Sequence, residues 1–330
     1  LVASHKWRTP RRKSDAVRAQ VSKCAHMTSC QNGKWTLRLL PVRRWFIPLI
    51  AVSVFIAANA GLLSDVIPPL DLLVHFQVQY AWVLAVCLVC LIIQKRLWWS
   101  LFTAAALLIP ASRIAPWYIP LSTPAQLEAH DSPKALSLLC CNVKWTNDDY
   151  ASTLTLIGSI DADIVVVQEA TPAWAMALDV LQNSYPYHIS HPAAGPRGMV
   201  MLSKRPLSQV QQALHPITQH CILSGWIELN HQPVQIIALH PFRPGLTHGA
   251  RNLESELQLA ASLAGGNTER TIFIGDLNTT MWSNTYHRFV ETQQLTNLRQ
   301  GAGIHASWSR LIPWVSAIPI DHCLIGKHLD

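Results

Sequence analysis

The stretch Thr271–Thr280 reads TIFIGDLNTT and joins a short apolar run to a group of polar residues. Its first four residues are β-branched or aromatic, which predicts a buried strand. Gly275 ends the run, and Asp276 and Asn278 follow it, two residues apart. On an extended chain both side chains would point to the same side, as at a cleft. Gly, Asp and Asn also favour turns, so the stretch alone is compatible with a turn or a functional site.

The composition indicates a membrane portion. Half of the 330 residues are hydrophobic and only 14% are charged, compared with about 25% in typical soluble proteins. The net charge of +7 is unevenly distributed, because residues 1–96 carry thirteen Lys and Arg against three Asp and Glu. Residues 131–330 carry twelve Lys and Arg against fifteen Asp and Glu. This part is therefore not expected to bind a polyanion through charge alone. The eight cysteines lack the paired spacing of a structural zinc site.

Three apolar runs predict a membrane segment over residues 45–120. They cover 45–63, about 72–93, and 97 to about 118, with Trp and Tyr near their ends as in interfacial belts. Pro110 and Arg113 interrupt the third run, so the segment contains two or three transmembrane helices. The alternative is a set of buried helices in a soluble protein.

The remaining chain divides by composition. We expect residues 1–44 to be a basic, disordered segment, 121–134 a polar linker and 135–330 a globular α/β domain. Lys and Arg precede the first apolar run and fill the link at 94–96, which predicts a cytoplasmic N-terminus. With three spans, the domain would lie on the outer, periplasmic side of a bacterial inner membrane. With two spans it would stay inside.

Six polar residues lie at the ends of five predicted strands. They are Asn142, Glu169, His240, Asp276, Asn278 and Asp321. Such a set predicts one site at one edge of a sheet. The carboxylates of Glu169 and Asp276 suit Mg²⁺ or Mn²⁺, and the imidazole of His240 can transfer a proton. The amides of Asn142 and Asn278 can donate hydrogen bonds to phosphoryl oxygens. This equipment indicates metal-assisted hydrolysis of a phosphate ester.

Five short motifs carry a resemblance to a known family. They are NV at Asn142, VVVQEA around Glu169, ALHP at His240, IGDLN at Asp276 and PIDHCLI at Asp321. In this order and spacing they resemble the endonuclease/exonuclease/phosphatase superfamily, and most of all its membrane-anchored bacterial branch. The resemblance implies an α/β (α+β) fold, a two-layer β-sandwich of mixed sheets flanked by helices, here preceded by a transmembrane helical segment.

The resemblance also implies roles for the six residues. Glu169 would be a ligand of Mg²⁺ or Mn²⁺, and Asn142 would help to orient metal or phosphate. His240 would assist departure of the leaving oxygen or stabilise charge, and Asp276 would orient or deprotonate the attacking water. Asn278 would hold the phosphoryl group, and Asp321 would position a catalytic group by hydrogen bonding.

The sequence departs from the family pattern near its end. Members carry a serine-aspartate-histidine motif close to the C-terminus, and no such motif follows Asp321 and His322. We therefore expect the domain to lack its C-terminal end in this chain. If Asp330 were the true terminus, the protein would lack its main catalytic dyad and be inactive, leaving a membrane-tethered binding module.

Four further residues are weaker candidates for substrate binding. They are Arg197, Arg251, Asn252 and Trp308. The expected substrate is a phosphodiester, which could belong to a nucleic acid, a phospholipid headgroup or a small molecule. The expected partner is the lipid bilayer. A phosphodiesterase or nuclease is the main hypothesis, with a lipid-headgroup phosphodiesterase and an inactive binding module as alternatives.

Overall fold

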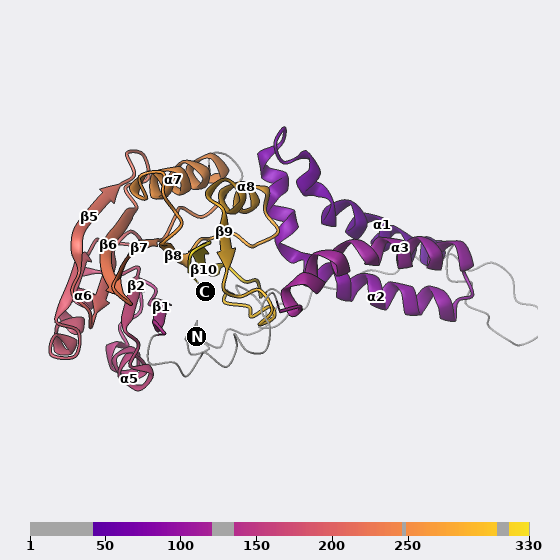
Figure 1. Ribbon diagram of the computed structural model, residues 1–330. Coiled ribbons are helices and arrows are strands. Elements are labelled where there is room, and N and C mark those ends of the chain that lie inside the picture. Colours follow the sequence, from indigo (N-terminus) through magenta and orange to yellow (C-terminus); the bar gives the residue numbers. More distant parts are fainter. Residues whose placement is uncertain (1–41, 121–134, 246–248, 309–316, 330) are drawn as a thin grey trace, which may run out of the picture.

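The computed structural model describes residues 42–120, 135–245, 249–308 and 317–329. Most of the segment expected to be disordered and the whole predicted linker, 121–134, lie outside these residues. Figure 1 shows two parts: a helical bundle that projects to one side, and a globular domain built on β-sheets.

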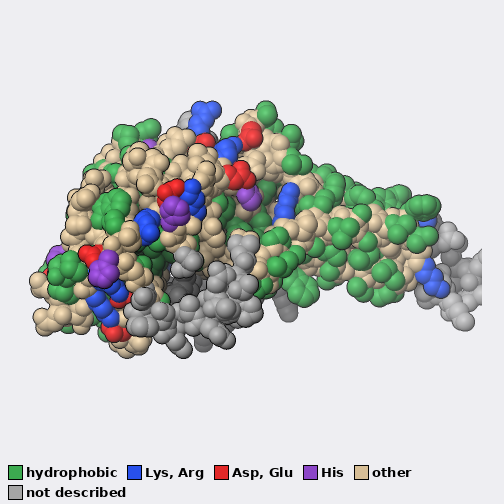
Figure 2. Space-filling model, in the orientation of Figure 1, with side chains coloured by type: hydrophobic (Ala, Val, Ile, Leu, Met, Phe, Trp, Pro, Cys, Tyr) green, Lys and Arg blue, Asp and Glu red, His purple; other side chains and the backbone are tan. Residues whose placement is uncertain are grey.

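The projecting bundle contains the three apolar segments. Its long helices are α1 (Val42–Ala58), α2 (Gln77–Ile93) and α3 (Leu97–Ile114), and the 3₁₀ helices are η1 (Ala60–Leu63), η2 (Pro68–Phe76) and η3 (Ala115–Tyr118). By length and composition, Arg44–Leu63, Pro68–Ile93 and Leu97–Tyr118 could each cross a membrane. The third helix continues past Pro110, so this proline does not end it. Many hydrophobic side chains are exposed on the face of the bundle that Figure 2 shows.

The first sheet of the globular domain has four strands. They are β1 (Leu138–Asn142), β2 (Ile164–Gln168), β3 (Tyr187–His191) and β4 (Met199–Ser203), arranged in the order β1-β2-β4-β3. β1 and β2 are parallel, and the other two pairs are antiparallel. β2 is buried along its whole length, as its continuous apolar sequence requires.

The second sheet has six strands. They are β5 (Ser208–Leu214), β6 (Cys221–Leu229), β7 (Gln232–Leu239), β8 (Thr271–Asp276), β9 (Leu295–Asn297) and β10 (Asp321–Gly326), in the order β5-β6-β7-β8-β10-β9. β7 and β8 are parallel, whereas β8 and β10 are antiparallel with Asp276 opposite Asp321. This register places the start of β10 beside the end of β8.

The two sheets pack face to face around a core of alternate apolar residues, including Val166, Met201, Ile236 and Ile274. The helices α5 (Tyr150–Ile160) and α6 (Pro172–Leu178), with η5 (Asp179–Leu181), cover the outer face of the first sheet. The helices α7 (Gly249–Leu263) and α8 (Asn284–Gln293) cover the second. The predicted fold, two mixed sheets flanked by helices, is thus confirmed.

Three strands have no clear signal in the sequence. β5 is exposed along almost its whole length, β3 is half exposed, and β9 has only three residues. All three lie at the edges of their sheets. An edge strand is held by one neighbour and buries little apolar surface, so its sequence lacks the hydrophobic pattern of a central strand.

Candidate active site

The structure brings the six polar residues of the strand ends together. Asn142 ends β1, Glu169 follows β2, His240 follows β7, Asp276 ends β8 and Asp321 begins β10. The ends of parallel neighbours β1 and β2 lie side by side, as do those of β7 and β8. The antiparallel β10 adds its first residue at the same edge. The site therefore lies at one side of the β-sandwich, where β1, β2, β7 and β8 end and β10 begins.

Asn142 links the carboxylates of the two sheets. Its Nδ2 donates to Glu169 Oε1 at 2.9 Å and to Asp276 Oδ2 at 3.4 Å. Its Oδ1 accepts from the backbone N–H of Lys144 at 3.0 Å. The amide thus holds two carboxylates near one point while its own orientation is set by the following loop.

Glu169 is a buried carboxylate held by several donors. Its backbone has a φ of 60°, a left-handed conformation that is uncommon for glutamate and often found at functional sites. Its Oε2 accepts from the Trp145 N–H at 3.0 Å, and its Oε1 lies 3.5 Å from His240 Nε2. Burial alone would raise the pKa of Glu169, but His240, the Trp145 N–H and Asn142 outweigh it and lower the pKa to about 2.

Both ring nitrogens of His240 face oxygen acceptors. Nδ1 donates to the backbone oxygen of Asp276 at 3.1 Å, and Nε2 faces Glu169. Burial alone would lower the pKa of His240, but the hydrogen bond to Glu169 and the charges of Asp276 and Glu169 raise it to about 9. A ring in this position carries both protons and a positive charge.

A buried pair of side chains, His220 and Glu256, lies next to His240. The ring of His220 stacks on that of His240 with centroids 6.0 Å apart, and His220 Nδ1 lies 3.2 Å from Glu256 Oε2. The same oxygen accepts from the Phe242 N–H at 2.9 Å. The sequence did not single out Glu256, because an acidic residue on an amphipathic helix usually faces water.

The stretch that opened the sequence analysis is both a turn and part of this site. The Asn278 N–H donates to Asp276 Oδ1 at 2.9 Å, and Asn278 has a φ of 52°. Its Nδ2 donates to the Pro241 oxygen at 2.9 Å, and a side-chain amide has a second N–H to offer. The two alternatives for this stretch therefore do not exclude each other.

Asp321 lies across the strand pair from Asp276. Burial, and then the charge of Asp276, raise the pKa of Asp321 above its ordinary value, against the opposing effects of Ser307, Arg299 and His240. Ser307 Oγ accepts from the Asp321 N–H at 3.1 Å. Two neighbouring acids in one buried site do not ionise independently, so one of them keeps its proton more readily.

Gln168 joins the two sheets beneath the site and was not predicted as a site residue. Its Nε2 donates to the Leu239 oxygen at 2.8 Å, and its Oε1 accepts from the Asp276 N–H at 3.1 Å. Gly275 allows this close approach, since a Cβ there would lie 1.9 Å from the Leu239 oxygen. A glutamine that directly follows four buried apolar residues was the available signal.

Removing the Gln168 side chain is expected to destabilise the domain. Gln168→Ala leaves a buried N–H at Asp276 and a buried oxygen at Leu239 without partners, at a cost of about 2 kcal/mol in the free energy of unfolding. Urea unfolding followed by tryptophan fluorescence measures this. Gln211→Ala, the same change on the exposed β5, should stay within about 0.5 kcal/mol. An equal decrease in the free energy of unfolding in Gln168→Ala and Gln211→Ala would contradict the bridging role of Gln168.

The four weaker candidates occupy different places. Arg197 is exposed, on a loop whose next residue, Gly198, accepts from the N–H of Ala170 beside Glu169. Trp308 pairs with Ile318, and its neighbour Ser307 contacts Asp321. Arg197 and Trp308 are therefore next in the chain to residues that contact Ala170 and Asp321.

Arg251 and Asn252 lie in the first turn of α7. Arg251 lines a separate pocket between α7, α8 and residues 64–71, with a volume of about 360 Å³. None of the six strand-end residues lines this pocket.

The donor set suits a hard, partly hydrated cation. Within the described ranges, no group of three or more His, Cys, Asp or Glu side chains is arranged so that it could hold a metal ion. Glu169 and Asp276 place carboxylate oxygens on either side of the Asn142 amide. Mg²⁺ is commonly bound by one or two carboxylates, waters and substrate phosphate rather than by a complete protein cage. The residues present fit such a metal.

The chain is similar to several solved structures at low sequence identity. No curated protein sequence matches the chain. Three solved structures share 17% identity with it: TDP2 of D. rerio in complex with a single-strand DNA product, a β-hairpin deletion mutant of beta toxin from Staphylococcus aureus, and sphingomyelinase C from Streptomyces griseocarneus. Their TM-scores are 0.48, 0.47 and 0.47. The matches cover 59%, 60% and 58% of this chain, and 86%, 89% and 84% of those chains.

The family assignment rests on a sequence match. The family model described as "Endonuclease/Exonuclease/phosphatase family" matches residues 139–329, well over half of the chain. The matched region contains all six strand-end residues and, except for Leu138 at the start of β1, both sheets. The chain belongs to the endonuclease/exonuclease/phosphatase family.

Proposed function

We propose that this protein is a membrane-anchored, divalent-metal-dependent phosphodiesterase. The observation that carries the proposal is the contact of Asn142 with both Glu169 and Asp276 beside the charged ring of His240. In this arrangement the carboxylates of Glu169 and Asp276 can bind a metal ion and a water molecule. The ring of His240 and the amide of Asn278 can bind phosphate. Metal-dependent phosphoester hydrolysis is the chemistry of the family.

The roles of the residues follow from their positions. Asp276 accepts a proton from a water molecule whose oxygen attacks phosphorus, and one P–O ester bond breaks. His240 donates the Nε2 proton, which faces Glu169 Oε1 at 3.5 Å in the absence of substrate, to the leaving oxygen. The free N–H of Asn278 donates to a phosphoryl oxygen. Asp321 lies opposite Asp276, and two neighbouring carboxylates are more stable when one of them carries a proton. The Asp276–Asp321 pair can therefore retain the proton taken from the water molecule.

Glu169 would hold the metal, and Asn142 would keep that carboxylate in place. A bound Mg²⁺ or Mn²⁺ supplies positive charge that stabilises the phosphate oxygens. The left-handed backbone of Glu169 and its hydrogen bond from Trp145 fix the carboxylate before any metal binds. Such pre-organisation lowers the energetic cost of assembling the site.

Removal of divalent metal tests the proposal. The full-length protein in detergent should hydrolyse bis(p-nitrophenyl) phosphate with Mg²⁺ or Mn²⁺. It should lose the activity in excess EDTA and regain it when the metal is restored. Undiminished hydrolysis in EDTA would overturn the metal requirement. No hydrolysis under any of these conditions would favour the alternative, a membrane-tethered binding module.

The substrate class is a phosphodiester, and a lipid headgroup or small diester fits the chain better than long nucleic acid. Residues 131–330 carry more acidic than basic side chains, which weakens non-specific attraction to a polyanion. Headgroup release from liposomes, measured beside plasmid nicking, separates these substrates. Faster nicking than headgroup release would reverse the preference.

The proposed location is the inner membrane, with three spans and the catalytic domain on the periplasmic side. Three helices meet the requirements of length and composition, and the Lys and Arg distribution orients them. A reporter enzyme that is active only in the periplasm, fused after the domain, tests this. Lack of reporter activity in an expressed fusion would contradict the orientation.

A further inference from the structure

The connection between β8 and α8, residues 277–283, is buried although it has no regular secondary structure. We call it the catalytic loop, because it begins next to Asp276 and includes Asn278. All its residues except Asn278 are buried. Loops normally run over the surface of a domain. This one is covered because the ends of the membrane helices pack on it.

Two buried side chains of η2 bind the catalytic loop. His75 Nδ1 and Thr280 Oγ1 are hydrogen-bonded at 2.9 Å. Asp71 Oδ2 accepts from the Ser283 hydroxyl at 2.5 Å, and its Oδ1 accepts from the Asn284 N–H at 3.1 Å. The Asp71 carboxylate thus lies at the N-terminus of α8, where a negative charge is favoured.

The ends of the other two membrane helices contact the same region. Asn284 Nδ2 donates to the Gly61 oxygen at 2.8 Å and to Ser64 Oγ at 2.9 Å. Trp282 Nε1 donates to the Arg113 oxygen at 3.1 Å. All three apolar segments therefore contribute to one docking surface on the catalytic loop and the start of α8.

The sheet holds the catalytic loop from the opposite side. His322 Nε2 donates to the Thr279 oxygen at 2.9 Å, while its Nδ1 accepts from Asn297 Nδ2 at 3.0 Å. Thr279 and Thr280 are adjacent, so one is held by the sheet and the next by the membrane segment. Only one residue separates Thr280 from Asn278.

We infer that the membrane segment is a positioning part of the active site. Asp71 and His75 hold the catalytic loop in the conformation that presents Asn278 and Asp276 to the substrate, so that efficient hydrolysis requires the docked segment. The inference rests on the proposed phosphodiesterase function. A displacement of about 1 Å in a catalytic group can reduce a rate by about 100-fold, so a small relaxation of the loop is enough to matter.

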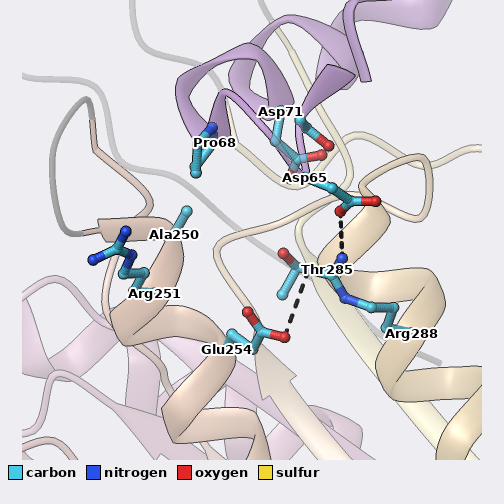
Figure 3. A pocket seen from close by; sticks show the side chains of 9 residues that line it. Asp65, Pro68, Asp71, Ala250, Arg251, Glu254, Thr285 and Arg288 are labelled. Atoms are coloured by element: carbon cyan, nitrogen blue, oxygen red, sulfur yellow. Dashed lines mark hydrogen bonds and ion pairs between the residues drawn. The ribbon is translucent and has the colours of Figure 1, made fainter. Parts of the chain in front are cut away.

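A neighbouring contact provides a matched control. In the pocket beside this surface, Arg288 Nη1 lies 2.5 Å from Asp65 Oδ1 and its Nη2 lies 3.6 Å from Glu254 Oε1 (Figure 3). Asp65 and Arg288 are exposed, and such pairs contribute little to stability. Asp65 belongs to the same segment as Asp71 and also contacts α8, but its ion pair is with Arg288, outside the catalytic loop.

The test compares these residues in the full-length protein in lipid nanodiscs. With bis(p-nitrophenyl) phosphate and Mg²⁺, Asp71→Ala and Thr280→Val should lower kcat by about 10- to 100-fold and change KM by less than about twofold. Asp65→Ala and Thr280→Ser should retain kcat within about twofold. Asp71→Asn keeps one acceptor oxygen and should recover part of the loss. Equal kcat in Asp71→Ala and Asp65→Ala would overturn the inference.

Hydrogen exchange gives a readout that does not depend on activity. Backbone amides of residues 277–284 should exchange faster in Asp71→Ala and Thr280→Val than in Asp65→Ala. If Asp71→Ala fails to fold, the nearly isosteric Thr280→Val decides the question. If the native protein hydrolyses no diester, the proposed function fails and exchange alone decides the inference. Unchanged exchange at 277–284 in Thr280→Val would then reject it.

Discussion

Asp276→Asn is expected to lower kcat for a phosphodiester by about 1,000-fold, within the range for loss of a general base. The asparagine keeps an oxygen that can accept from the Asn278 N–H, so the turn is preserved. It lacks the negative charge that would take the proton of the attacking water, and it also weakens the field that keeps His240 protonated. The loss should therefore appear in kcat more than in KM. Steady-state kinetics with bis(p-nitrophenyl) phosphate and saturating Mg²⁺ measures it.

The control for this prediction is Asp179→Asn, the same change at an exposed position in η5. It should leave kcat and KM unchanged. If Asp276→Asn retained more than about a tenth of the native kcat, Asp276 would not be the base, and the proton would have to be accepted by another group.

His240→Gln is expected to lower kcat by about 100- to 1,000-fold, the usual effect of removing one donor that stabilises developing negative charge. Glutamine can still donate to the Asp276 oxygen, so the backbone contact survives. The positive charge next to Glu169 is lost, and so is the proton that His240 would give to the leaving oxygen. Substrates with a good leaving group, such as p-nitrophenol, need this proton less than alkyl diesters.

The leaving group therefore supplies a sharp measurement. The ratio of native to His240→Gln activity should be larger for an alkyl phosphodiester than for bis(p-nitrophenyl) phosphate. The same ratio for both substrates would show that His240 stabilises charge without protonating the leaving oxygen. His188→Gln, at an exposed position of β3, should change neither activity.

Much of the candidate site could be predicted from the sequence because its residues belong to strand ends. The apolar run Thr271–Ile274 predicts a buried strand. A polar residue that directly follows such a run lies at the point where the strand leaves the sheet. Parallel neighbours bring such ends together, so the sequence predicts Asn142, Glu169 and His240 near Asp276. The family motifs are short, but four of them lie at the end of a strand and the fifth, at Asp321, lies at the start of one.

The weaker predictions depended on loops and helix termini, where local sequence says little about position. Arg251 comes soon after His240 in the sequence, yet it lines a pocket against residues 64–71 and not the site at the strand ends. Glu256 and His220 form a buried pair behind His240 although neither stands out in the sequence. Their roles depend on how α7 packs on the second sheet, which no local pattern specifies.

The sequence by itself determined the central strands of both sheets, the apolar segments and the residues placed at the strand ends, because these follow from local hydrophobic period and turn chemistry. Only the tertiary structure decided how the two sheets stack, with Gln168 spanning them. It alone decided that Asp71 and His75 contact a loop some 200 residues later in the chain. Hydrogen bonds between such distant residues depend on the packing of whole layers. A buried acid or histidine in an apolar segment gives no local indication of its partner.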